Sequence, residues 1–314
     1  MYLTKNESHM LKTLISIITL LFLNTAFSQK METVSLDKND PTKNCYTIIY
    51  PDALPWKGCL FLLPGFGENA ERVLSQTSLP LEAAKNGILT IIPTLQDGVL
   101  SFGVDSVSQQ TLQMIVDDVA SKHKISSLNF FIGGFSLGGS AAIKFAENAK
   151  IKPKAVFAID PPLDFERFYY SALRDLRLTT DGKENQENVY MGLRIQEIMG
   201  GTPETALVNY YAVSPYSFTD EAQTAVKKLI EMPLRIYSEP DINWWMKERN
   251  ADITSMNVTD CSAMINELNR LGNQQAVLIT TQNKGFRKPD HKRHPHSWSI
   301  VENPELIQWL LQQK

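Results

Sequence analysis

The chain has 314 residues, of which 43% are hydrophobic and 21% charged, and its formal net charge is −3 at pH 7. This composition is typical of a globular protein that can bury one substantial core. The small negative charge gives no electrostatic argument for a nucleic-acid partner or for binding to an anionic membrane. We therefore expect a globular protein that has no nucleic-acid partner.

The first 28 residues have the pattern of a secretory signal peptide. Lys5 and Lys12 precede an apolar run over residues 14–23, and Ala26 and Ser28 supply small residues before a cleavage point. The apolar run is about ten residues long, whereas a membrane-spanning helix needs about 20. The pattern predicts removal of residues 1–28, a mature chain from residue 29 with no integral membrane segment, and export to the periplasm or the medium.

Only three cysteines are present, at positions 45, 59 and 261. An exported chain of this length does not need a disulfide framework, and an odd count leaves at least one thiol unpaired. We expect all three to be buried as small apolar side chains, with a Cys45–Cys59 disulfide as the alternative. No metal-ligand spacing involves them, and we expect neither a metal nor an organic cofactor.

The first strand predicted along the chain covers residues 45–50, and continuous apolar runs of strand length follow it. Continuous apolarity, rather than alternation, is typical of strands in a parallel sheet that is covered on both faces. The predicted strands are residues 45–50, 58–63, 87–92, 128–132, 155–159, 234–237 and 276–281.

Helical patterns alternate with these strands. Residues 105–123 carry apolar side chains at helical spacing, and residues 137–149, 261–271 and the segment from 303 also read as helices. Strands and helices in alternation predict a three-layer α/β domain with a mostly parallel central sheet.

One insertion interrupts this alternation, over residues 161–232. It contains no clear buried strand, and residues 165–178, 184–199 and 220–230 are predicted to be helical. So long a segment after a strand favours a helical cap over a loop. The mature chain is therefore predicted to be one domain, 29–314, that carries a helical cap.

The strongest chemical signal is the pentapeptide Gly134 to Gly138, a G-x-S-x-G motif with Ser136 at its centre. It follows a predicted strand and precedes a predicted helix, which is the context in which this motif forms a nucleophile elbow. Glycines are needed because the chain turns so sharply that side chains at 134 and 138 would collide with neighbouring backbone. The motif predicts that Ser136 is a nucleophile at a helix N-terminus.

On this motif and its setting, the chain resembles the α/β-hydrolase superfamily from about residue 45 to the end, and in particular exported esterase-like serine hydrolases. The resemblance implies the α/β-hydrolase fold. It also implies an oxyanion hole made by two backbone N–H groups, one from the loop after an early strand. The Gly-rich loop at residues 62–68 fits that role, so the hole is expected at Phe66 and Leu137, although many relatives have His where this chain has Pro64.

A serine hydroxyl needs a base to become an effective nucleophile. Three of the five histidines, at 291, 294 and 296, follow the last predicted strand, where the superfamily places its catalytic base. The residues after His296 resemble the usual ending best, and His294 is the alternative base.

The carboxylate that orients the histidine should follow a strand. Asp241 lies at the usual offset after the strand 234–237 and is the first choice. Glu239 is close enough to be an alternative. Asp160 is the other alternative, because it ends the strand after the elbow helix, where some superfamily members keep their acid.

Several residues bear on the substrate. Trp244 and Trp245 follow the expected acid and could stack on a sugar or an aromatic group. The loop that carries the histidines is strongly basic and could attract an anionic ester, such as an acidic sugar ester. Its cations are Lys284, Arg287, Lys288, Lys292 and Arg293.

Taken together, these residues predict a serine hydrolase that cleaves a small-molecule or carbohydrate ester through an acyl-enzyme. Three alternatives remain open at this stage. A peptidase or amidase, and an acyltransferase, would use the same residues. A non-catalytic binding protein would retain the scaffold and lack a competent base or acid.

Overall fold

The computed structural model describes residues 29–37, 39–52, 54–123, 129–178 and 186–313. The predicted signal peptide, residues 1–28, lies outside the described residues. Within those ranges, no helix combines the length and the apolar character needed to cross a membrane. The three cysteines are buried and free, so Cys45 and Cys59 do not form a disulfide.

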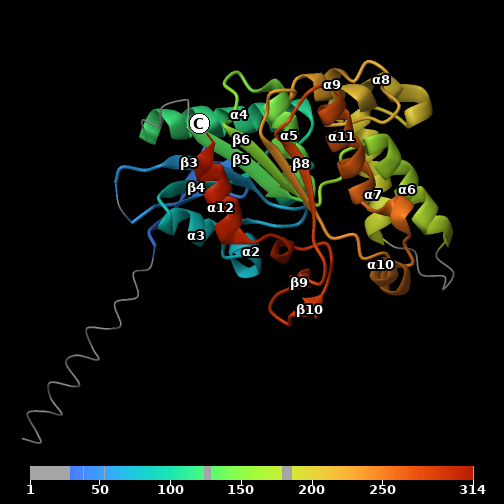
Figure 1. Cartoon of the computed structure of the whole chain (residues 1–314). Helices are drawn as coiled ribbons and strands as arrows, with labels where there is room; N and C mark the ends of the chain where they lie inside the picture. Colours follow the sequence, from blue (N-terminus) through green and yellow to red (C-terminus); the bar gives the residue numbers. More distant parts are fainter. Residues whose placement is uncertain (1–28, 38, 53, 124–128, 179–185, 314) are drawn as a thin grey trace, which may run out of the picture.

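The centre of the molecule is an eight-stranded sheet with the order β1-β2-β4-β3-β5-β6-β7-β8 (Figure 1). Strands β3 to β8 run parallel, while β2 pairs antiparallel with both β1 and β4. The predicted mostly parallel sheet is thus confirmed. The strands are β1 (Met31–Ser35), β2 (Cys45–Ile49), β3 (Gly58–Leu63), β4 (Ile88–Thr94), β5 (Phe130–Phe135), β6 (Ala155–Ile159), β7 (Leu234–Ser238) and β8 (Ala276–Thr280).

Helices cover both faces of this sheet and complete the three layers (Figure 1). One apolar core lies between the sheet and α4, α5 and α11, and a second lies between the sheet and α2, α3 and α12. These helices are α2 (Ala70–Gln76), α3 (Leu79–Lys85), α4 (Ser106–His123), α5 (Leu137–Asn148), α11 (Val258–Arg270) and α12 (Asn303–Gln312).

The two cores explain why the central strands are apolar at most positions. In β3, Cys59, Phe61 and Leu63 enter one core, while Leu60 and Leu62 enter the other. Each fully buried side chain of Leu or Phe size contributes about 1.5–3 kcal/mol. A polar residue anywhere in such a strand would lose this contribution, which is why the sequence predicts these strands well.

The segment between β6 and β7 forms a helical cap at one end of the sheet (Figure 1). Helix α6 matches its predicted bounds. Helix α7 begins within the predicted range, whose first residues lie outside the described part of the chain. The predicted helix 220–230 is wrong for most of its length, and α8 was not predicted. The cap helices are α6 (Phe165–Leu178), α7 (Gln186–Met199), α8 (Pro203–Val213) and the short α9 (Thr224–Lys227).

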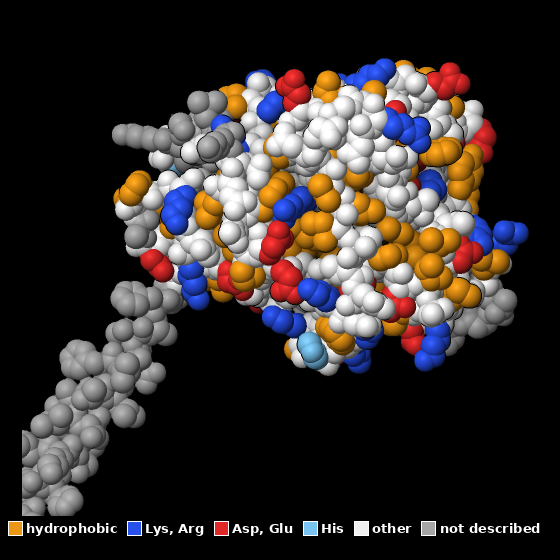
Figure 2. All heavy atoms as spheres, in the orientation of Figure 1, with side chains coloured by type: hydrophobic (Ala, Val, Ile, Leu, Met, Phe, Trp, Pro, Cys, Tyr) orange, Lys and Arg blue, Asp and Glu red, His pale blue; other side chains and the backbone are white. Residues whose placement is uncertain are grey.

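Part of the cap's apolar surface faces outward (Figure 2). The inward faces of its helices pack into a third core around Phe165, Tyr169 and Met191. On the outside, the side chains of Leu193 and Val208 are among those that remain exposed. The cap is therefore held by its inner core and by polar anchors to the rest of the domain.

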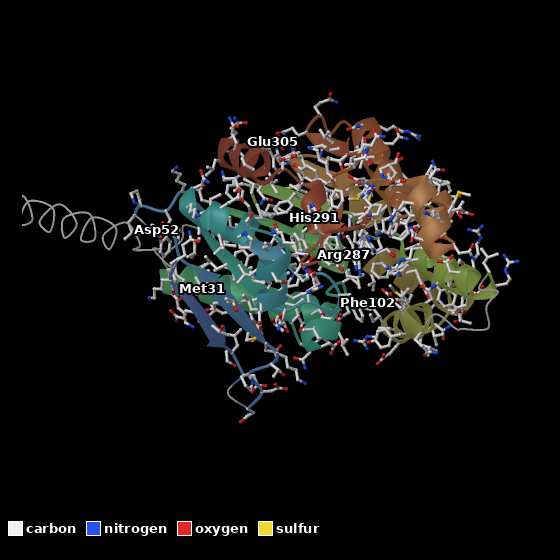
Figure 3. All side chains as sticks on the ribbon, turned by 90° about the horizontal axis from the view of Figure 1, so that it is seen from below. Met31, Asp52, Phe102, Arg287, His291 and Glu305 are labelled. Carbon is white, nitrogen blue, oxygen red and sulfur yellow. The ribbon has the colours of Figure 1, made fainter. Side chains whose placement is uncertain are left out.

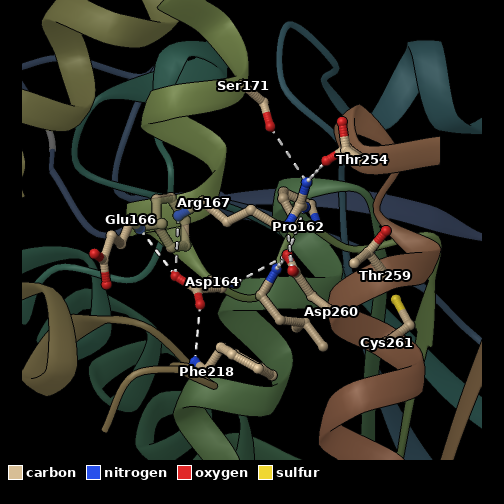
Figure 4. A network of polar contacts seen from close by, with 12 residues as sticks. Pro162, Asp164, Glu166, Arg167, Ser171, Phe218, Thr254, Thr259, Asp260 and Cys261 are labelled. Carbon is tan, nitrogen blue, oxygen red and sulfur yellow. Dashed lines mark hydrogen bonds and ion pairs between the residues drawn. The ribbon is translucent and has the colours of Figure 1, made fainter. Parts of the chain in front are cut away.

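A buried polar network provides the main anchor (Figure 4). Asp260 of α11 binds the Arg167 guanidinium of α6, with Nη2 2.6 Å from Oδ2, and accepts hydrogen bonds from the backbone N–H groups of residues 163 and 164. Asp164 accepts bonds from the first turn of α6 and from the N–H of Phe218. Both carboxylates are 2% exposed, so each relies on these partners in place of water.

This network makes the stability of the cap depend on pH. Burial, and next the charge of Asp260, raise the pKa of the Asp164 carboxyl to about 6. In an unfolded chain the pKa is about 4. The folded protein therefore binds this proton more tightly, and the resulting stabilisation is present below about pH 4 and lost as the pH rises through about 6.

We predict that the unfolding free energy of the wild type, relative to Asp164→Asn, falls as the pH rises from about 4 to 6 and is constant above about 7. Urea denaturation of both proteins across this range measures it. The exposed Glu231→Gln variant is the control and should give a difference that does not vary with pH. If the difference in unfolding free energy between the wild type and Asp164→Asn does not change with pH, the raised pKa of Asp164 is contradicted.

Candidate active site

Ser136 lies on the sharp turn that joins β5 to α5. Its φ of 53° and ψ of −126° are rarely adopted by a residue with a side chain. Its N–H donates to the carbonyl of Ile159 at the end of β6, over 2.8 Å. The turn is thus fixed by its neighbouring strand, and strain of this kind is typically concentrated at functional sites.

The two glycines that flank Ser136 allow backbone segments to approach each other closely. A Cβ on Gly134 would lie 2.5 Å from the carbonyl carbon of Gly138 and 2.7 Å from the carbonyl oxygen of Leu63. A Cβ on Gly138 would lie 2.3 Å from the carbonyl oxygen of Pro64. These contacts are with backbone, which cannot move aside, so both positions require glycine.

Two backbone N–H groups are positioned to serve as an oxyanion hole. Leu137 is the first residue of α5, where a helical N–H has no intrahelical partner. The N–H of Phe66 also has no hydrogen-bond partner among the described residues. Both residues line one cavity with Ser136. Glu68 holds the loop that carries Phe66 in place, because its carboxylate accepts hydrogen bonds from the Gly65 N–H and the Trp298 indole N–H.

His296 pairs with Asp160 across 136 residues of sequence. Its Nδ1 lies 2.7 Å from Oδ2 of Asp160. The other carboxylate oxygen accepts a 2.6 Å bond from the hydroxyl of Ser238, and Asp160 is only 6% exposed. With Nδ1–H bound to the carboxylate, Nε2 is the nitrogen left to accept a proton. The imidazole stacks against Phe135 at 4.5 Å between ring centroids.

The structure does not bring Asp241 to His296, so the first choice of acid from the sequence is replaced by the alternative, Asp160. Asp241 caps α10 (Ile242–Arg249) by accepting the N–H of Trp244, and its other oxygen lies 2.7 Å from Arg293. Its carboxylate is attracted to a helix N-terminus and a guanidinium, away from the imidazole.

Glu239, the other alternative acid, also binds groups other than His296. It is 3% exposed and accepts the hydroxyl of Thr281 and the backbone N–H groups of Lys284 and Gly285. It also forms an ion pair with Arg293. This carboxylate therefore holds the start of the histidine loop in place.

His294 is buried beside the site in surroundings that disfavour its charged form. Burial first, then the positive charges of Arg287, His296 and Arg249, lower the pKa of its imidazole to about 3. Its Nε2 lies 3.2 Å from the Arg249 guanidinium, and its ring packs against Trp244. A group that stays neutral at every physiological pH is a weak proton acceptor, so this environment favours His296 as the base.

The site opens into a cavity of about 460 Å³ between the sheet and the cap. The cap contributes apolar residues, such as Phe168 and Met191, and polar ones, such as Ser171, Asp175 and Glu187. Phe66 adds an apolar side chain from the loop after β3. Of the two expected aromatic residues, Trp245 lines the cavity, while Trp244 packs behind it against His294. Within the described residues, no group of His, Cys, Asp or Glu has an arrangement that could hold a metal ion.

The basic loop is largely neutralised by its own ion pairs. Lys284 pairs with Glu302, Lys292 with Asp290, and Arg293 with Glu239 and Asp241. Lys288 is exposed. Arg287, which lies in β9 (Phe286–Arg287) and faces the short β10 (Lys292–Arg293), is the cation of this loop that lines the cavity.

Sequence reasoning missed three residues that support the site. Ser238 and Asn257 hold Asp160 through its carboxylate and its backbone carbonyl, and Arg249 reaches the cavity from the end of α10. Ser238 follows a predicted strand directly, which is a usable signal. Asn257 and Arg249 stand in segments without a motif, so only the folded chain reveals them.

The chain matches no family model, and no curated protein matches it in sequence. Solved structures share its architecture over most of their length and of its own. The chain has the α/β-hydrolase fold. A fluorophosphonate-binding serine hydrolase of Staphylococcus aureus, FphF, covers 90% of this chain and 99% of its own at 17% identity and a TM-score of 0.56.

Two further structures agree with this comparison. An S-formylglutathione hydrolase from Agrobacterium tumefaciens covers 92% of this chain and 97% of its own at 12% identity, with a TM-score of 0.57. The Est2 esterase of Thermogutta terrifontis, determined with butyrate bound, covers 89% of this chain and 92% of its own at 14% identity, with a TM-score of 0.55. Identities this low establish the hydrolase fold alone, so activity has to be argued from the site of this chain.

The close backbone approach of this hydrolase fold at Gly138 can be tested directly. We predict that Gly138→Ala lowers the unfolding free energy by about 1–3 kcal/mol, because the added carbon meets backbone it cannot displace. Urea denaturation measures the change.

The matched control is Gly192→Ala in α7, where the added carbon would meet only Leu173, at 3.9 Å. This variant should gain about 0.5–1 kcal/mol from better helix propensity. Equal effects of the two substitutions would show that the turn does not depend on the contact.

Proposed function

We propose that this protein is a serine hydrolase that cleaves a carboxylic ester through an acyl-enzyme intermediate. The observation that carries the proposal is the 2.7 Å contact between Nδ1 of His296 and Asp160, in the same cavity as the strained Ser136. A buried carboxylate, an imidazole and a serine at a helix N-terminus form the combination that activates a hydroxyl for acyl transfer.

The reaction begins when Ser136 Oγ attacks the ester carbonyl carbon and its proton passes to Nε2 of His296. Asp160 holds the imidazole in the orientation and tautomer that accept this proton and stabilises the imidazolium that forms. The developing oxyanion is bound by the N–H groups of Phe66 and Leu137, and removing one such donor typically costs about 10²–10³ in rate.

The tetrahedral intermediate then expels the alcohol, which takes its proton from His296. The acyl group remains on Ser136 until water, activated by the same imidazole, attacks the acyl carbon. Release of the acid restores the hydroxyl. No step in this sequence requires a metal ion or an organic cofactor.

The ester class is supported by the site and by the neighbours of the fold. The solved structures with the same architecture include an esterase and proteins described as hydrolases. The apolar lining residues Phe66, Phe168 and Met191 suit an acyl group, while Trp245 offers a flat surface on which a sugar ring can stack. A small-molecule or carbohydrate ester is therefore the proposed substrate.

The assignment of Asp160 generates a paired prediction. Asp160→Asn should lower kcat for 4-nitrophenyl acetate by about 10³–10⁴, because an amide no longer holds the imidazole in the required tautomer. Steady-state kinetics of the purified mature protein measure this.

Asp241→Asn serves as the comparison, since it removes a similar carboxylate that contacts Arg293 rather than His296. We expect its kcat to stay within about threefold of the wild type, as a surface ion pair contributes little. A larger loss in Asp241→Asn than in Asp160→Asn would overturn the assignment.

A further inference from the structure

Three arginines line the cavity, namely Arg72, Arg249 and Arg287, and for two of them, Arg249 and Arg287, the guanidinium group contacts a neutral group. Arg249 reaches it from the end of α10, and Arg287 from β9. Among the described residues, neither has a carboxylate within ion-pair distance. Other arginines of the chain do form ion pairs, namely Arg167, Arg174, Arg194, Arg235, Arg270 and Arg293. Among the described residues, Arg249 and Arg287 therefore differ from most arginines of the protein, and Arg72 shares their lack of an ion pair.

Both guanidinium groups are positioned by neutral neighbours. Arg287 Nη2 donates to the backbone carbonyl of His296 over 3.2 Å, and Arg249 Nη2 lies 3.2 Å from Nε2 of His294. Each guanidinium has five N–H donors in a planar fork, so most of its donor capacity remains unused. Seen from below, Arg287 lies between the sheet layers and the cap helices (Figure 3).

Both positively and negatively charged side chains act on Arg287. Burial lowers the pKa of its guanidinium, and the positive charges of Arg249 and Arg72 lower it further, whereas Glu68 and Glu187 act in the opposite direction. Glu68 is occupied by the Gly65 N–H and the Trp298 indole. A bound anion would reduce the electrostatic repulsion between the guanidinium groups. The paired N–H donors of a guanidinium can also bind both oxygens of a carboxylate.

The location of Arg287 indicates which part of an ester would carry that anion. Its partner is the backbone of His296, the residue that returns a proton to the departing alcohol. This link to the histidine loop points to the leaving-group part of the ester, whereas Phe168 and Met191 line the cavity from the cap.

We propose that Arg287 and Arg249 bind a carboxylate on the alcohol part of the ester, so that the preferred substrates have an anionic leaving group and a small apolar acyl group. This inference rests on the proposed ester hydrolysis and adds a substrate class to it. Arg287 is then a determinant of specificity, and the exposed cations of its loop are not.

The test compares 4-acetoxybenzoate with 4-acetoxybenzamide. The two esters are of similar size, but the first carries a carboxylate and the second carries an uncharged amide. We expect the wild type to favour the benzoate in kcat/KM by about 10- to 100-fold, as expected for charged hydrogen bonds. Arg287→Gln should remove most of this ratio, and Arg287→Lys should restore part of it, because the charge returns without the fork.

Lys288→Gln is the matched control. It removes the same charge from the adjacent residue, whose side chain is exposed and does not line the cavity. We expect it to keep the wild-type ratio. Equal loss of the ratio in Lys288→Gln and Arg287→Gln would indicate long-range attraction by the loop and would overturn the proposal. A wild type with no preference for the benzoate would overturn it as well.

A binding measurement separates this proposal from the proposed hydrolysis. Titration calorimetry with Ser136→Ala, which cannot form the acyl-enzyme, should show tighter binding of 4-acetoxybenzoate than of 4-acetoxybenzamide. Adding Arg287→Gln should remove most of the difference. Equal binding of the two esters contradicts the carboxylate site. Preferential binding without turnover by the wild type supports the carboxylate site and contradicts the hydrolase.

Discussion

The site depends on how closely the backbone after β3 approaches the start of α5. Because Gly134 and Gly138 have no Cβ, the carbonyls of Leu63 and Pro64 can pack directly against the turn. This contact holds Ser136 in its strained conformation and brings the Phe66 and Leu137 amides into the same cavity as the hydroxyl. The elbow and the proposed oxyanion hole are therefore two consequences of one packing constraint.

Two parts of the fold complete the cavity around Ser136. The cap is held to α11 by the pair of Arg167 and Asp260, and it contributes both apolar and polar residues to the cavity lining. The histidine loop is fastened by Glu239, whose carboxylate binds its backbone and Arg293. It supplies His296 and the polar wall of the cavity. Two buried acids thus act as structural anchors, while Asp160 is the one directed at the imidazole.

The sequence predicts this fold well where residues are buried on both faces of the sheet, because such strands must be apolar at every position. It predicts poorly the strand β1, which is mostly exposed, and the short helices, whose few buried positions leave no periodic pattern. The elbow was predictable because its motif is local. The acid could not be predicted from the sequence, because Asp160 and Asp241 both follow strands. In the folded chain Asp241 contacts Arg293, which lies far along the sequence, and Asp160 contacts His296.

The most direct test of the account is covalent labelling of the purified protein by a fluorophosphonate, followed by intact mass and peptide mapping. The account predicts one adduct per chain, on Ser136, that is absent from Ser136→Ala. It also predicts that Ser140→Ala is labelled normally, because Ser140 lies on the same helix but is buried and bonded to the carbonyl of Pro162. A folded wild-type protein that takes no label, or takes it at another residue, would contradict the claim that this turn carries an activated serine.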